Sequence, residues 1–219
     1  MKKEKIKKGI FNQKQSLTVP IRYRMVGEAK DYLSVHPIDS EILECLKKID
    51  VLIYGGYVRD LIAKKYNPNF QSGFKDIDII ALPNSHNILR TRLEVIGYKR
   101  EQINYAPLEL KAYNHWGSVK HIFTMVKGNQ KIQIASPRPI MGDDPVNIKN
   151  ILLEPAKGVD IRCCAVAITS NMKLIELLPG AYDDCKKMEL RESSMASHKI
   201  NLNQRIQKLT ARGWNRAKS

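Results

Sequence analysis

The residues best suited to chemistry lie in one stretch, residues 51–82. An apolar run at 51–54 has the length and composition of a strand, and Gly55 and Gly56 separate it from a segment with the apolar spacing of a helix. Glycines at such a junction let the backbone approach a ligand, while the start of a helix offers free N–H groups and a positive dipole end. The junction is therefore predicted to bind phosphate, with Arg59 adding a charge-assisted contact.

A pair of carboxylates follows in the same stretch. Residues 76–81 alternate and then become apolar, which predicts a strand with Asp76 and Asp78 on one face. Two neighbouring carboxylates repel each other unless a cation or a proton lies between them, and Mg²⁺ prefers carboxylate and phosphate oxygens. Each half alone is explained by a turn or by a solvated strand face. Together, a phosphate site and a carboxylate pair favour metal-dependent phosphoryl or nucleotidyl transfer.

These motifs also resemble a known family. GGYVRD at 55–60 followed by DID at 76–78 is similar to the signature of the DNA polymerase β-type nucleotidyltransferase superfamily. The similarity is greatest to the head domain of tRNA nucleotidyltransferases (CCA-adding) and bacterial poly(A) polymerases. Fifteen residues separate Asp60 from Asp76, which is longer than is usual in that family.

The resemblance carries specific expectations. It implies an α/β (α+β) fold, with a mixed sheet of about five strands flanked by helices. It implies that a nucleoside triphosphate is bound by four residues of the first motif: Gly55, Gly56, Arg59 and Asp60. It also implies that Asp76 and Asp78 are catalytic and hold Mg²⁺ or Mn²⁺.

A hairpin is predicted from residue 119 to residue 135, with its turn at Gly128 and Asn129. Its second strand is similar to a family motif of the form EVTTFR, which carries a third carboxylate. Gln133 stands at that position, and a neutral amide binds a metal weakly and cannot act as a base. Catalytic competence then depends on another group, for which Glu109 and the pair at 143–144 are candidates.

A further family motif, RRDFTINALAY, is similar to residues 160–168. The apolar pattern alone fits a strand or a buried helix. The resemblance implies a helix with Asp160 near its start, contacting nucleotide. The paired arginines of the motif fall on residues 158–159 and its asparagine on Cys164, so contacts to nucleotide should be weaker. The adjacent thiols at 163–164 are interpreted as core packing.

The resemblance divides the chain into three regions. These are a basic N-terminal arm at 1–36, a head domain at 37–192 and a basic C-terminal extension at 193–219. The arm is expected to be disordered or draped over a partner. A short helix is predicted at 203–212, and Trp214 is expected either to stack on a base or to pack on the head.

The net charge of +15 is unevenly distributed. Residues 1–24 hold eight basic and one acidic residue, and residues 186–219 hold nine and two, whereas residues 25–185 are close to neutral. Basic ends on a neutral core predict a polyanionic partner, most simply RNA, although solubilising tails would have the same composition. The candidate nucleic-acid-binding residues are Lys2, Lys3, Lys5, Lys7, Lys8, Arg205, Arg212 and Arg216.

Composition excludes several other classes. No apolar run is long enough for a transmembrane helix, no secretory signal is visible, and the four cysteines lack zinc-site spacing. The expectation is a protein with reduced thiols in a cytosol-like compartment. A lone head domain would suit a virus or a mobile element.

Two functions follow from these patterns. The first is a metal-dependent nucleotidyltransferase that transfers a nucleotide from a nucleoside triphosphate to a nucleic-acid 3′-hydroxyl. The second is a head that keeps the fold without catalysis and serves as a nucleic-acid-binding or structural module. The intact glycine and aspartate motifs favour the first, and Gln133 favours the second.

Overall fold

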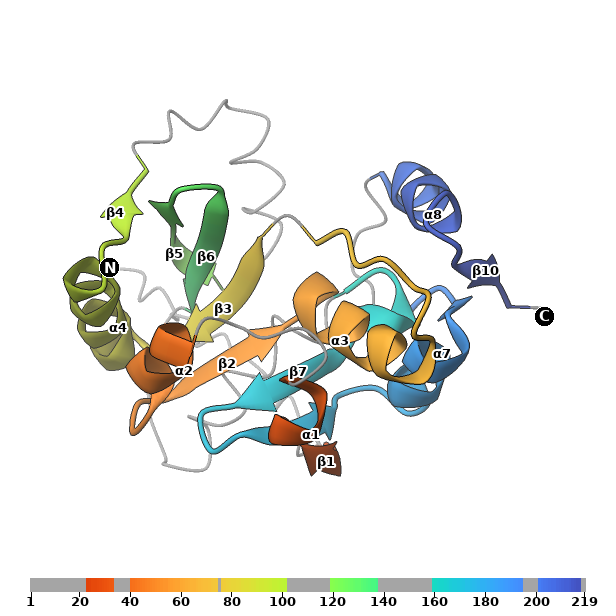
Figure 1. Cartoon of the computed structure of the whole chain (residues 1–219), viewed down its shortest axis with the longest axis horizontal. Coiled ribbons are helices and arrows are strands. Elements are labelled where there is room, and N and C mark those ends of the chain that lie inside the picture. The colour runs from red at the N-terminus through yellow and green to blue at the C-terminus, as the bar shows by residue number, and fades with distance from the viewer. Residues whose placement is uncertain are drawn as a thin grey trace, which may run out of the picture.

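The computed structural model describes residues 23–33, 40–74, 76–101, 119–137, 159–194 and 201–217. Its central element is one eight-stranded mixed sheet (Figure 1). The strands in spatial order are β1 (Arg24–Glu28), β8 (Lys173–Glu176), β7 (Val166–Thr169), β2 (Val51–Tyr54), β3 (Ile77–Ala81), β6 (Gln130–Pro137), β5 (Val119–Lys127) and β4 (Lys99–Arg100). Neighbours are antiparallel except β3 and β6, which are parallel. The α/β class is confirmed, with more strands than the predicted five.

Helices accompany this sheet, and several of them pack on it. They are α1 (Lys30–Leu33), α2 (Ser40–Leu46), α3 (Gly56–Tyr66), α4 (Pro83–Val95), α7 (Ala181–Lys187) and α8 (Leu202–Thr210), with a 3₁₀ helix η1 at Arg162–Cys164. Helix α3 packs against β2, β3 and β7, while α4 packs against β3 and β6. Helix α7 lies beside α3 (Figure 1). Within the described ranges, no helix has both the length and the apolar character needed to cross a membrane.

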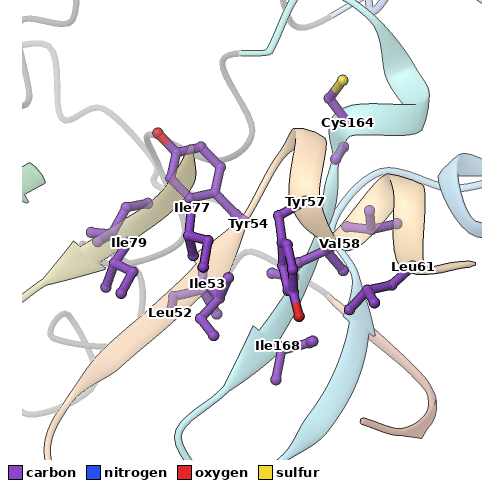
Figure 2. Close-up of a cluster of buried hydrophobic side chains, with 14 of the residues drawn as sticks. Leu52, Ile53, Tyr54, Tyr57, Val58, Leu61, Ile77, Ile79, Cys164 and Ile168 are labelled. Carbon is purple, nitrogen blue, oxygen red and sulfur yellow. The ribbon is translucent and has the colours of Figure 1, made fainter. Parts of the chain in front are cut away.

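Apolar side chains between α3 and the sheet hold the helix against the strands. Val58 and Leu61 of α3 are buried, as are Ile53 of β2 and Ile79 of β3 (Figure 2). All four residues of β2 are buried, which explains why the sequence there is an uninterrupted apolar run. Because α3 follows directly after β2, this packing holds the glycine junction at the end of the central strand.

The segment similar to the RRDFTINALAY motif differs from its prediction. The implied helix is limited to the single turn of η1, and residues 166–169 form strand β7 between β2 and β8. The apolar pattern fits either a strand or a helix. In the structure this segment is a strand because it pairs with a neighbour on each side, as Ala167 does with Tyr54 and with Ile175. Cys163 and Cys164 are buried, in agreement with the core-packing interpretation.

Part of the predicted arm belongs to the sheet. Residues 24–28 form β1, which pairs with β8, and Ala29 and Tyr32 contribute to the core. The first 22 residues, with the predicted nucleic-acid-binding lysines Lys2, Lys3, Lys5, Lys7 and Lys8, lie outside the described residues.

The C-terminal segment packs on the same core. Leu202, Ile206 and Leu209 of α8 are buried. Their spacing places them on one apolar face of the helix, and this face packs on the core. Strand β10 (Asn215–Arg216) then pairs in parallel with β9 (Glu189–Leu190). Trp214 is fully buried, so of its two predicted roles the structure supports packing on the head. The division at residue 192 remains a prediction.

Trp214→Ala is expected to destabilise the whole molecule. The ring lies edge-on to Phe70, with 6.0 Å between centroids, and its removal leaves a cavity that costs about 3–5 kcal/mol. Urea unfolding of the two proteins measures the loss. Arg216→Ala, at an exposed neighbouring position, is the control and should change stability by less than about 0.5 kcal/mol. A similarly small loss for Trp214→Ala would show that the segment is a separable tail.

Candidate functional site

Of the two glycines at the junction, only Gly55 has a backbone conformation that favours glycine. Gly55 has a φ of 76°, and a Cβ added to it would lie 3.3 Å from Oδ2 of Asp78. Both the left-handed backbone and the close approach to the carboxylate therefore favour glycine at this position. A Cβ on Gly56 would make only an ordinary contact with Arg59, at 3.6 Å. The start of α3 has no side-chain cap, so its first N–H groups are not satisfied in that way.

The predicted carboxylate pair lies beside this junction. Strand β3 begins one residue later than predicted, so Asp76 is an exposed residue just before the strand and Asp78 is a half-buried residue within it. Register places Asp78 between Tyr54 of β2 and Gln133 of β6. Residues directly opposite each other in a sheet share a face. The structure thus brings Gln133 to the side of Asp78 where a third carboxylate was expected.

The carboxylates influence each other electrostatically. Burial raises the pKa of Asp78 to about 7, and the negative charge of Asp76 adds to the shift, whereas Arg205 and Arg59 oppose it. A divalent cation between the two carboxylates would remove this penalty. The donor set, two carboxylates and the Gln133 amide, therefore fits an oxygen-preferring ion such as Mg²⁺ or Mn²⁺.

A third carboxylate for this ion is not found in the part of the chain that the structure describes. There, no three His, Cys, Asp or Glu side chains are grouped in a way that could hold a metal. The predicted substitutes, Glu109, Asp143 and Asp144, lie outside the described residues. The electrostatic argument for a metal at this site therefore rests on Asp76 and Asp78.

Asp60 has a different role from the one predicted. Its carboxylate is fully buried, and Oδ1 accepts hydrogen bonds from Nε and Nη2 of Arg59 at 2.9 and 2.7 Å. Oδ2 accepts from the backbone N–H of Gly73 at 3.2 Å and from Nη2 of Arg212 at 2.5 Å. With four donors and no exposed surface, Asp60 cannot reach a nucleotide. It joins α3 to the loop that leads to Asp76 and to the C-terminal segment.

Arg59 is also held inside the protein. Its Nη1 donates to Sγ of Cys164 at 3.3 Å, and its guanidinium lies 5.3 Å from the ring centroid of Trp214. The predicted direct contact of Arg59 with phosphate is not available in this arrangement, because the side chain is 6% exposed and engaged with Asp60. Its positive charge still lies beneath Gly56, where it favours an anion at the helix start.

The predicted nucleic-acid-binding arginines of the extension fall into two groups. Arg205 and Arg212 form ion pairs with Asp160 and Asp60, so both connect the extension to the predicted nucleotide residues. Asp160 is buried and accepts from Nη1 of Arg205 at 2.5 Å. Arg212 is mostly buried, but the side chain of Arg205 is 48% exposed at the edge of the site. Arg216 is exposed and lies in β10.

The sequence predicts a short helix and basic residues in the C-terminal segment, but not the contacts of this segment with the site. Trp214 lies against Arg59, and Arg205 and Arg212 pair with Asp160 and Asp60. The available signal was the apolar spacing in α8, which predicts a helix with one covered face. Cys164 was assigned to the core without its contact to Arg59, and nothing in the sequence indicates that contact.

Comparison with known proteins supports the fold. A CCA-adding enzyme solved with ATP superposes with a TM-score of 0.55 at 20% identity, covering 85% of this chain and 40% of that one. The Thermotoga maritima CCA-adding enzyme complexed with tRNA gives 0.57 at 18%, covering 90% and 43%. No family model and no curated protein sequence matches. The chain therefore shares its fold with CCA-adding enzymes, as predicted, and spans less than half of their length.

Asp78→Asn is expected to stabilise the metal-free protein, and more so at pH 8 than at pH 5. The folded-state pKa is raised to about 7 from the ordinary 3.8, so between these values folding retains a proton that the unfolded chain releases. The stability of the wild type therefore falls as pH rises through this window. Asn does not titrate, so the stability of the variant should lack this fall. Urea unfolding of both proteins in EDTA at the two pH values measures it. An equal difference at both would contradict the burial of this carboxylate.

Proposed function

We propose that this protein is a metal-dependent nucleotidyltransferase that adds a nucleotide from a nucleoside triphosphate to a nucleic-acid 3′-hydroxyl. The observation that carries the proposal is the close approach of Gly55 to Asp78, which joins an uncapped helix start to a carboxylate pair. Phosphate and its metal ion need these two features side by side. A solvated strand face or an ordinary turn does not require them together.

Each residue has a distinct role in the proposed reaction. Backbone N–H groups at Gly55 and Gly56 bind the triphosphate, and the buried Arg59 supports them electrostatically. Asp76 and Asp78 hold the metal, which when bound neutralises phosphate charge and lowers the pKa of the attacking hydroxyl. Arg205, half exposed beside Asp160, offers a cation at the edge of the site.

The fold neighbours are consistent with these ligands. Related structures are described as complexes of CCA-adding enzymes with ATP, with CTP and with tRNA. We therefore propose a nucleoside triphosphate as donor and RNA as acceptor. The basic ends, including Lys2, Lys3, Lys5, Lys7 and Lys8, are proposed to contribute to RNA binding through their charge.

A second candidate is a head without catalysis, acting as a nucleic-acid-binding or structural module. Gln133 favours it, because its register position beside Asp78 supplies an amide where the related motif has a carboxylate. The two candidates differ in one measurable property, which is transfer of label from a triphosphate. Binding of RNA is expected from both.

Asp76→Asn and Asp78→Asn should each abolish transfer, by at least about 100-fold, because each removes a charged metal ligand. The assay incubates wild type and variants with each labelled nucleoside triphosphate, Mg²⁺ or Mn²⁺, and mixed RNAs. Asp50→Asn, at an exposed position just before β2, is the matched control and should retain activity. Transfer that survives in the double variant would refute the site, and absence of transfer in wild type would favour the second candidate.

Gln133→Glu should strengthen metal binding and raise the rate of transfer. The new carboxylate would stand beside Asp78 and add charge to the donor set. Titration with Mn²⁺, followed together with the transfer rate, measures both effects. Gln130→Glu, near the beginning of the same strand, is the matched control, and an equal gain there would show that added negative charge alone is responsible.

A further inference from the structure

A second surface of the head combines half-buried and exposed lysines with tyrosines. It is formed where the C-terminal end of α3 meets α7, and we call it the α3–α7 patch. Its members are Lys64, Lys65, Tyr66, Tyr182, Lys186 and Lys187. Tyr66 is 43% exposed, which is unusual for a large ring on an otherwise well-covered helix. None of these residues takes part in the site described above.

The tyrosines are held in place by their own hydrogen bonds. The hydroxyl of Tyr182 lies 2.7 Å from that of Tyr32 and 2.8 Å from that of Tyr66. The rings of Tyr66 and Tyr182 meet edge-on, with 6.3 Å between centroids. Tyr66 is thus a fixed aromatic surface rather than a freely rotating side chain. A fixed ring loses little conformational entropy when a ligand stacks on it.

The lysines place positive charge beside these rings. Nζ of Lys186 lies 5.1 Å from the ring centroid of Tyr66, and Nζ of Lys65 lies 4.1 Å from that of Tyr32. Two acidic residues are close enough to moderate the charge, Asp183 at 3.7 Å from Lys186 and Asp31 near Tyr32. Lysines at a helix C-terminus are also stabilised by the negative end of the helix dipole. That effect does not account for the exposed Tyr66.

We propose that the α3–α7 patch binds a single-stranded stretch of the nucleic-acid partner. Lysines would neutralise phosphates while Tyr66 stacks on a base, the combination typical of single-strand binding surfaces. Charge alone would bind any polyanion. An aromatic ring beside lysines is more specific, because in a single strand each phosphate is followed by a base that can stack on the ring. The ordinary charge balance of the central region does not reveal this surface, because it arises only when α3 and α7 pack together.

The position of the patch predicts which part of the acceptor it contacts, and this step rests on the proposed function. Helix α3 begins at Gly56 and has 11 residues, so its two ends are separated by roughly 16 Å at 1.5 Å per residue. At about 3.4 Å per stacked nucleotide, this corresponds to about five nucleotides. The patch would therefore hold the acceptor several nucleotides upstream of its reacting end.

Binding can be tested without catalysis, with a labelled 20-nucleotide single-stranded RNA titrated against salt. Lys65→Gln/Lys186→Gln should reduce the salt slope by about 0.7 per lost phosphate contact. The matched control is Lys47→Gln/Lys99→Gln, which removes equal charge from exposed positions on α2's end and β4, on the opposite side of the molecule (Figure 1). An equal reduction in both double variants would overturn the proposal, since it would reflect net charge alone.

Stacking is tested at Tyr66. Tyr66→Ala should weaken RNA binding by roughly 5- to 150-fold, the range for loss of base stacking. Tyr66→Phe keeps the ring and loses only the hydrogen bond to Tyr182, so it should lose much less affinity than Tyr66→Ala. Thermal unfolding of both variants checks that the fold is retained. If Tyr66→Phe loses as much affinity as Tyr66→Ala, or if neither loses any, the ring does not stack on a base.

Acceptor length separates this proposal from the proposed function. Transfer to a three-nucleotide acceptor should be unchanged in Lys65→Gln/Lys186→Gln, because such an acceptor does not reach the patch. The KM for a 20-nucleotide acceptor should rise. If wild type transfers to neither acceptor but the RNA titrations still distinguish patch from control, the proposed function fails and the patch stands. Equal effects on both acceptor lengths would overturn the patch.

Discussion

The buried carboxylate of Asp60 is the group on which the rest of the site depends. A charge without exposed surface is tolerated only when donors surround it, and here they come from Arg59, Gly73 and Arg212. Removing either arginine would break a buried ion pair, which typically costs about 3–5 kcal/mol. Three distant segments are therefore held together by one side chain. The loop that delivers Asp76 is one of them, so the carboxylate pair depends on a residue that touches no ligand.

This arrangement explains why binding groups and supporting groups are interleaved along the chain. Gly55 and Gly56 present backbone to the surface, and the next two charged residues, Arg59 and Asp60, point into the protein. Positive charge is thus fixed under the proposed phosphate site without being exposed to solvent. A buried charge is screened less by salt than a surface charge. The helix start can in this way attract an anion even where the surrounding surface is close to neutral.

Local patterns in the sequence predicted the strands β2 and β3 and the hairpin turn at Gly128. These features depend on alternation and turn chemistry, which neighbouring residues determine. The position of Gln133 beside Asp78 could be predicted only from the resemblance to a family. Contacts between distant segments were not predictable in either way. Arg212 reaches Asp60, and Arg59 contacts Cys164 and the ring of Trp214, because of tertiary packing that local patterns do not encode.

The ion pair between Asp60 and Arg212 also has a consequence for synthesis of the chain, since 152 positions separate the two residues. At roughly 5–20 residues per second, a ribosome needs on the order of 8–30 s to add that many. During this interval the glycine junction and both carboxylates of the motif have been translated, but Asp60 has one donor too few. Until the C-terminal segment is synthesised, α3 therefore lacks one of the ion pairs that hold it, and we expect it to be packed less stably.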